Sequence, residues 1–180
     1  MLTGYWGKMR GLTKSPPRVG LQEIFWSWLG SFLGIGAVAA AHYAFFEGTD
    51  LVLIIGSFGA SAVLIYGATK SPLAQPRNLI GGHLISAVIG VTMLKLCGPW
   101  LWLAAALAVS LSIAAMHATK TLHPPGGATA LIAVISGPKI QQLGYLYVLL
   151  PVASGALIMV LIALIINNLA PSRRYPEFWL

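Results

Sequence analysis

Long apolar stretches alternate with short polar segments along the whole chain. A helix needs about 20 apolar residues to cross a hydrocarbon core, and five of the stretches reach or approach that length. The remaining stretch has 13 residues and begins with Pro-Pro-Gly-Gly. The pattern predicts an all-α membrane protein with six transmembrane helices, and it leaves open whether the short stretch spans fully. The stretches are Ile24–Phe46, Leu51–Ala68, Leu79–Leu96, Trp100–Ala118, Pro124–Ser136 and Gly144–Asn167.

Two of these stretches carry related motifs. Residues 59–64 read Gly-Ala-Ser-Ala-Val-Leu, and residues 127–132, which lie 68 positions later, read Gly-Ala-Thr-Ala-Leu-Ile. Each motif follows Gly or Pro helix breakers and lies between two longer stretches. We therefore predict two three-helix halves, residues 20–96 and 97–170, with short, broken second and fifth helices. Three crossings per half give the halves opposite orientations, an inverted repeat typical of secondary transporters. The alternative is a small-residue packing motif that recurs by chance.

The composition excludes several classes of protein. Of the 180 residues, 57% are apolar and 8% are charged, whereas soluble domains carry roughly 25% charged residues. This excludes a soluble domain, a disordered tail and a free nucleic-acid binder. The remaining class is a polytopic membrane protein, whose partner is the lipid bilayer. The single cysteine, Cys97, excludes an internal disulfide and a cysteine-based metal cluster.

The charges suggest an orientation. If six runs cross and the N-terminus is cytoplasmic, nine basic residues lie inside and two, Lys95 and Lys139, lie outside; if the short run only dips in, the ratio is eight to three. The positive-inside rule favours six crossings. We thus expect the N-terminal segment 1–19 and the C-terminal tail 171–180 to be cytoplasmic. The nine inner residues are Lys8, Arg10, Lys14, Arg18, Lys70, Arg77, Lys120, Arg173 and Arg174.

The segment from His123 to Thr129 is the strongest candidate for a binding site. Two prolines favour the first turn of a helix there, and the following glycines allow the backbone to approach a ligand. A helix that begins at this point presents N–H groups and a partial positive charge, which suit an anion. The glycines could instead serve only close helix packing. The predicted ligands here are His123, Gly126, Gly127, Ala128 and Thr129.

The first half contains an equivalent helix start, with Gly56, Ser57, Gly59 and Ser61 as predicted ligands. In inverted halves the two starts would face each other near the membrane midplane. No Asp or Glu lies deep inside an apolar run, although cation carriers commonly place one there. The residues therefore favour a small anion, bound without a full charge.

Three further residues could relay a proton or an anion, namely His83, His117 and Lys120. Equally, these histidines could cap helices, and the lysine could determine topology. A metal site at His117 and His123 lacks an obvious third ligand, so we expect no metal and no cofactor. No nucleophile–base pair suggests an enzyme.

The His123-Pro124-Pro125 tripeptide and the following Gly-Gly-Ala-Thr-Ala resemble the HPP family of integral membrane proteins, which is named for that tripeptide. The stretch from Gly56 to Leu64 and the Gly81-Gly82-His83 segment are also similar to this family, and the resemblance covers about residues 20–170. It implies a bacterial inner-membrane or plastid-envelope protein. Since some members act in nitrite transport, it also implies nitrite as a substrate.

These observations predict a multi-pass protein of the bacterial inner membrane that transports a small monovalent anion, and nitrite is the first candidate for that anion. The alternative from another class is a membrane sensor or scaffold that transports nothing. Residues 1–19 and 171–180 alone lie outside the predicted halves, which leaves such a scaffold little partner surface. Whether the protein is a channel or a carrier stays open, and small-residue helix faces leave room for a homo-oligomer.

Overall fold

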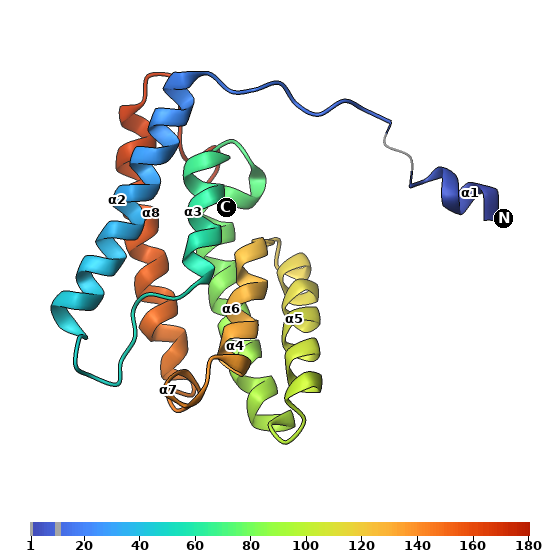
Figure 1. The fold of residues 1–180 in the computed structure, drawn as a ribbon, viewed down its shortest axis with the longest axis vertical. Coiled ribbons are helices and arrows are strands. Elements are labelled where there is room, and N and C mark those ends of the chain that lie inside the picture. The colour runs from blue at the N-terminus through green and yellow to red at the C-terminus, as the bar shows by residue number, and fades with distance from the viewer. Residues whose placement is uncertain (1, 10–11) are drawn as a thin grey trace.

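The computed structural model describes residues 2–9 and 12–180, and every regular element in them is a helix (Figure 1). The predicted all-α class is therefore confirmed for this part of the chain. A short helix that the sequence did not predict, α1 (Leu2–Gly7), lies apart from the helical bundle in Figure 1. Arg10, counted above among the inner basic residues, lies outside the described residues.

Four helices form the long elements of the bundle. They are α2 (Leu21–Phe45), α4 (Pro76–Cys97), α5 (Leu101–Ala118) and a continuous run made of η2 (Val148–Ala153) and α8 (Ser154–Leu169). Within the described residues, these four are long and apolar enough to cross a membrane. They correspond to the first, third, fourth and sixth predicted runs.

The other two runs form half-length helices. The helices α3 (Ser57–Gly67) and α6 (Pro124–Ile135) have 11 and 12 residues, about 17 Å of helix each. The prediction of one helix over Leu51–Ala68 is wrong at its start, since residues 51–55 are not helical. Val52, Ile54 and Ile55 are β-branched residues, which fit extended backbone, and the Leu53 N–H donates to His42 Nδ1 at 3.4 Å.

The helices pack in two groups joined through α3 and α6. In one group α2 packs on α8 and α3, and in the other α4 packs on α5 and α6. Two short helical segments, η1 (Pro72–Ala74) and α7 (Pro138–Gln141), lie in connections. Close approach depends on small residues, because a Cβ at Gly90 of α4 would lie 2.6 Å from the Ala130 carbonyl oxygen of α6.

The bundle has two ends. We use "terminal end" for the end where α2 begins, α8 ends and the tail 170–180 lies, and "loop end" for the end with Phe45, Cys97 and α7 (Figure 1). Arg77 donates to the Thr119 carbonyl, which brings the start of α4 beside the end of α5 at the terminal end. Lys70 and Arg173 line one pocket there, whereas Lys139 belongs to α7 at the loop end.

Candidate functional site

The half-length helices begin beside each other and run in opposite directions (Figure 1). The Ser57 hydroxyl at the start of α3 lies 2.8 Å from the Thr129 hydroxyl in the second turn of α6. In the reverse pairing, Ser61 Oγ in the second turn of α3 lies 2.9 Å from Nε2 of His123, which precedes α6. The first turn of each helix is thus placed against the second turn of the other.

His83 of α4 lies between the two half-length helices. Its Nε2 is 2.7 Å from Ser61 Oγ, and its Nδ1 is 2.7 Å from Thr129 Oγ1. Ser61 and Thr129 occupy equivalent positions of the two repeated motifs. One imidazole is therefore hydrogen-bonded on both sides by matched hydroxyl groups, one from each half of the chain.

These contacts form one buried group, which we call the central polar cluster. Each side chain in it is at most 1% exposed to solvent. No Lys, Arg, Asp or Glu of the described residues forms a hydrogen bond or ion pair with it. The site is therefore polar and uncharged unless a histidine takes up a proton. The cluster consists of Ser57, Ser61, His83, His123 and Thr129.

A backbone carbonyl fixes the direction of hydrogen bonding. His123 Nδ1 lies 2.8 Å from the Leu73 oxygen, and because a carbonyl only accepts, this nitrogen carries the hydrogen. In the neutral ring Nε2 then accepts from Ser61, whose single proton is thereby used. Ser61 must accept from His83 Nε2–H in turn, which leaves Nδ1 of neutral His83 as an acceptor.

Two of the backbone N–H groups predicted to bind an anion, those of Gly126 and Gly59, are already hydrogen-bonded. The Gly126 N–H donates to the His123 carbonyl at 2.8 Å, and the Gly59 N–H donates to the Gly56 carbonyl at 3.2 Å. Gly126 packs against α4, where a Cβ would lie 2.8 Å from the Gly82 oxygen. Gly56, which precedes α3, and Gly59 in its first turn are both exposed. The predicted side-chain donors thus meet in the cluster, whereas these glycines do not line it.

The other predicted residues lie elsewhere. Gly127, Ala128 and His117 line a largely apolar pocket of about 550 Å³ between α5 and α6. Lys120 is exposed beyond the end of α5 and, like His117, does not contact the cluster.

A second cavity, which sequence reasoning missed, is lined by residues that precede α3 and by residues from the loop-end half of α6 and from α7. It has a volume of about 480 Å³. One wall includes Gly56, next to Ser57, and another includes Ile132, one turn beyond Thr129. Lys139 was interpreted above only as a topology determinant because nothing in the sequence links it to the repeat. We call this cavity the loop-end vestibule, lined by Val52, Ile54, Ile55, Gly56, Ile132, Ser136, Lys139 and Ile140.

The vestibule offers unused polar groups. The backbone N–H groups of Val52 and Ile54 donate to no other described residue. The Lys139 side chain is exposed and forms no ion pair within the described part of the chain. The residues that line the cavity therefore include a positive charge and N–H groups without a partner in the described chain, both of which suit an anion.

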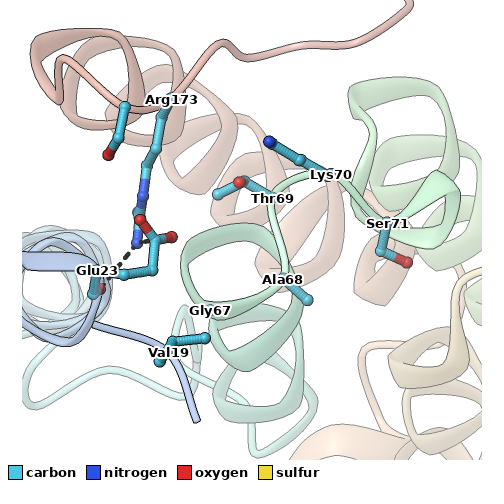
Figure 2. Close-up of a pocket in the computed structure, with 9 residues that line it drawn as sticks. Val19, Glu23, Gly67, Ala68, Thr69, Lys70, Ser71 and Arg173 are labelled. Atoms are coloured by element: carbon cyan, nitrogen blue, oxygen red, sulfur yellow. Dashed lines mark hydrogen bonds and ion pairs between the residues drawn. The ribbon is translucent and has the colours of Figure 1, made fainter. Parts of the chain in front are cut away.

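A third cavity, of about 340 Å³, lies at the terminal end between α2, the end of α3 and the tail. Figure 2 shows Arg173 reaching Glu23 at one side of it, with Thr69 and Lys70 at the other. Arg173 Nη2 lies 2.6 Å from the Glu23 carboxylate, and the guanidinium also donates to Asn167 and Ser27. Since these contacts involve both terminal nitrogens of the guanidinium, we assign it to fastening the tail onto α2.

Comparison with known proteins identifies the family. The HPP transmembrane region matches residues 16–176. A transmembrane protein of Dictyostelium discoideum is 52% identical over 178 residues, covering 97% of this chain and 57% of that protein. A second is 51% identical over 172 residues, covering 94% and 60%.

This chain thus spans less than two thirds of the length of these relatives. Their source lends no support to the predicted bacterial membrane. No solved structure matches the chain. The apolar helices and the family match together show a multi-pass membrane protein, and the chain belongs to the HPP family of transmembrane proteins.

Proposed function

We propose that the protein moves a small monovalent anion, with nitrite as the first candidate, across the membrane. The observation that carries this proposal is the central polar cluster, an uncharged set of hydroxyl and imidazole groups where two half-length helices begin. Buried donors can replace the hydration shell of an anion, and cation pathways commonly use intramembrane carboxylates. A neutral site also holds an anion loosely enough to release it.

The proposed architecture is two inverted three-helix halves, α2–α3–α4 and α5–α6–α8. The packing supports it, because α2 contacts α8 of the other half as α5 contacts α4. The antiparallel contact of α3 with α6, and the matched contacts of Ser61 and Thr129 with His83, also agree with a twofold relation. Transporters built this way bind substrate at broken helices near the midplane.

The loop-end vestibule is the proposed route to the cluster. Non-helical backbone at membrane depth is tolerated where it is buried in protein or lines a water-filled cavity. The unpaired N–H groups of Val52 and Ile54 fit the second situation. Lys139 would raise the local concentration of anions by its charge.

The cluster itself is closed in this structure, since its members hydrogen-bond to one another. Binding would separate the Ser57 and Thr129 hydroxyls, which lie 2.8 Å apart, and let both donate to the anion. This closure favours a carrier or a gated channel over a permanently open pore.

The test is uptake of nitrite, nitrate, formate and chloride into proteoliposomes, with protein-free liposomes subtracting the passage of undissociated acid. Thr129→Val keeps the side-chain shape and removes the hydroxyl. Because a hydrogen bond to a charged group contributes about 1.5–3 kcal/mol, we expect roughly a tenfold or greater loss of nitrite kcat/KM. The matched control is Thr92→Val, at an exposed hydroxyl of α4 outside the cluster and the vestibule.

Two results would contradict the proposal. Full uptake by the Thr129→Val variant would place the binding site outside the cluster. Uptake by the folded wild-type protein no faster than in protein-free liposomes would favour the alternative, a membrane sensor or scaffold that transports nothing.

A further inference from the structure

Building on the proposed anion transport, we infer that His83 takes up one proton together with each anion, so that the transported unit is a proton plus an anion. The inference comes from counting donors and acceptors in the central polar cluster. Its members are joined in the order Leu73 carbonyl, His123, Ser61, His83, Thr129 and Ser57.

With both histidines neutral, every hydrogen points toward Leu73. The argument from the carbonyl leaves His83 Nδ1 as an acceptor, so Thr129 must donate its only proton there. Thr129 then has to accept from Ser57, which is the reverse of the direction in the structure, where the Thr129 hydroxyl donates to Ser57 at 2.8 Å and lies 3.3 Å from the Pro125 carbonyl. In this state Ser57 has used its proton inside the cluster, and the hydroxyl nearest the vestibule has no hydrogen for an anion.

One added proton changes this end of the cluster. The proton binds the lone pair of His83 Nδ1, and no other covalent bond forms or breaks. Both ring N–H groups then donate, one to Ser61 and one to Thr129. The Thr129 hydroxyl then no longer donates to His83, so the hydroxyls of Thr129 and Ser57, which lie 2.8 Å apart in this structure, can both turn to donate to an anion arriving past Gly56.

The surroundings of His83 couple binding of the proton to binding of the anion, because they provide no other charge to balance either one. From α3 it meets Ser61 and the ring of Phe58, whose centroid is 5.5 Å from that of the imidazole at an interplanar angle of 74°. From α6 it meets Thr129, whose carbonyl accepts from the titratable Tyr147, and the ring centroid of His123, also titratable, is 5.0 Å away. No carboxylate of the described residues contacts it to balance an imidazolium.

An imidazolium alone or an anion alone would be an unpaired charge in a buried site, which is strongly unfavourable. Bound together they form a neutral pair. The proton and the anion should therefore bind together and be released together. The transport cycle should then move no net charge.

The first test measures charge and protons during nitrite uptake into proteoliposomes. We expect one proton per nitrite, and a rate that responds to a pH gradient and not to a potential set with valinomycin and potassium. His83→Gln keeps a hydrogen-bonding side chain that does not titrate, and it should reduce pH-driven uptake at least tenfold. The control, His42→Gln, replaces a histidine outside the cluster and retains an acceptor for the Leu53 N–H.

The second test needs no transport. Adding sodium nitrite to the purified wild-type protein in weakly buffered detergent should take up one proton per bound nitrite, and the His83→Gln variant should take up none. Nitrite uptake that carries net negative charge, or binding without protons, would overturn the inference and leave anion transport standing. Absence of both nitrite binding and nitrite uptake would overturn the two together.

Discussion

Ser61 joins two imidazole rings through one oxygen atom. Its Oγ lies 2.7 Å from His83 Nε2 and 2.9 Å from His123 Nε2, and the side chain is fully buried. A hydroxyl can donate once and accept twice, so it can accept from one ring while it donates to the other. An aliphatic side chain here would leave both ring nitrogens without a partner.

We predict that Ser61→Ala lowers the free energy of unfolding in detergent by about 1–3 kcal/mol for each ring nitrogen left unpaired. The thermal unfolding midpoint, followed by tryptophan fluorescence, measures this loss. Ser110→Ala is the matched control, because the Ser110 hydroxyl is exposed on α5. Equal midpoints for the two variants would contradict the assigned role of Ser61.

At the scale of residues, the sequence identified most side chains of the central polar cluster, but it did not show which of them contact one another. The repeated motif pointed to Ser61 and Thr129, the helix start before it pointed to Ser57, and the Pro-Pro pair pointed to His123. His83 was considered only as a relay, since it lies outside the repeat and reaches the site through the packing of α4. Lys139 was missed as a vestibule residue because its proximity to Gly56 depends on how α7 folds back.

At the scale of the elements, Gly90 of α4 lies close to the backbone of α6. A Cβ on Gly90 would lie 2.6 Å from the Ala130 oxygen and 2.9 Å from the Ala130 Cα. Both atoms belong to the backbone of α6, so they cannot move aside as a side chain would. The contact therefore requires hydrogen at this position.

Gly90→Ala should separate these helices and destabilise the protein by roughly 1–3 kcal/mol, the usual range for overpacking. Gly36→Ala is the matched control, because nothing lies within 4 Å of a Cβ at Gly36 on α2. The thermal unfolding midpoint and the rate of nitrite uptake should both fall in Gly90→Ala, and both should stay unchanged in Gly36→Ala. An unchanged Gly90→Ala protein would show that α4 and α6 pack differently in the membrane.

Element positions were largely predictable, while one helix start was not. Hydropathy located α2, α4 and α5 within a few residues, since each is one continuous apolar run. It could not separate the extended residues 51–55 from α3, because both parts are equally apolar. The break reflects β-branched residues before Gly56 and the contact of Leu53 with His42, a relation 11 positions apart.

At the scale of the whole molecule, we predict six passages of the described part of the chain between the two ends of the bundle. Two of the passages combine non-helical residues with a half-length helix, and the other four are long helices. This arrangement places Glu47 at the loop end and Arg174 at the terminal end. By the positive-inside rule the terminal end, with Lys70, Arg77 and Lys120, should face the cytoplasm.

Cysteine labelling tests this orientation. In a Cys97→Ser background, Glu47→Cys should react with a membrane-impermeant maleimide added to intact cells. Arg174→Cys should react after permeabilisation only. Labelling of both sites in intact cells would contradict six passages, and the reverse pattern would invert the orientation.

The tail is connected to the buried site through two consecutive carbonyl groups, those of Leu73 and Ala74. The Tyr175 hydroxyl donates to the Ala74 carbonyl at 2.8 Å, and His123 Nδ1 donates to the carbonyl of the preceding residue, Leu73, also at 2.8 Å. Releasing the tail frees the short segment that orients His123, and altering His123 disturbs the segment that holds the tail. Because such linkage is reciprocal, a partner that displaces residues 173–177 should also change the hydrogen bonding of His123 and, through it, the protonation of the central polar cluster.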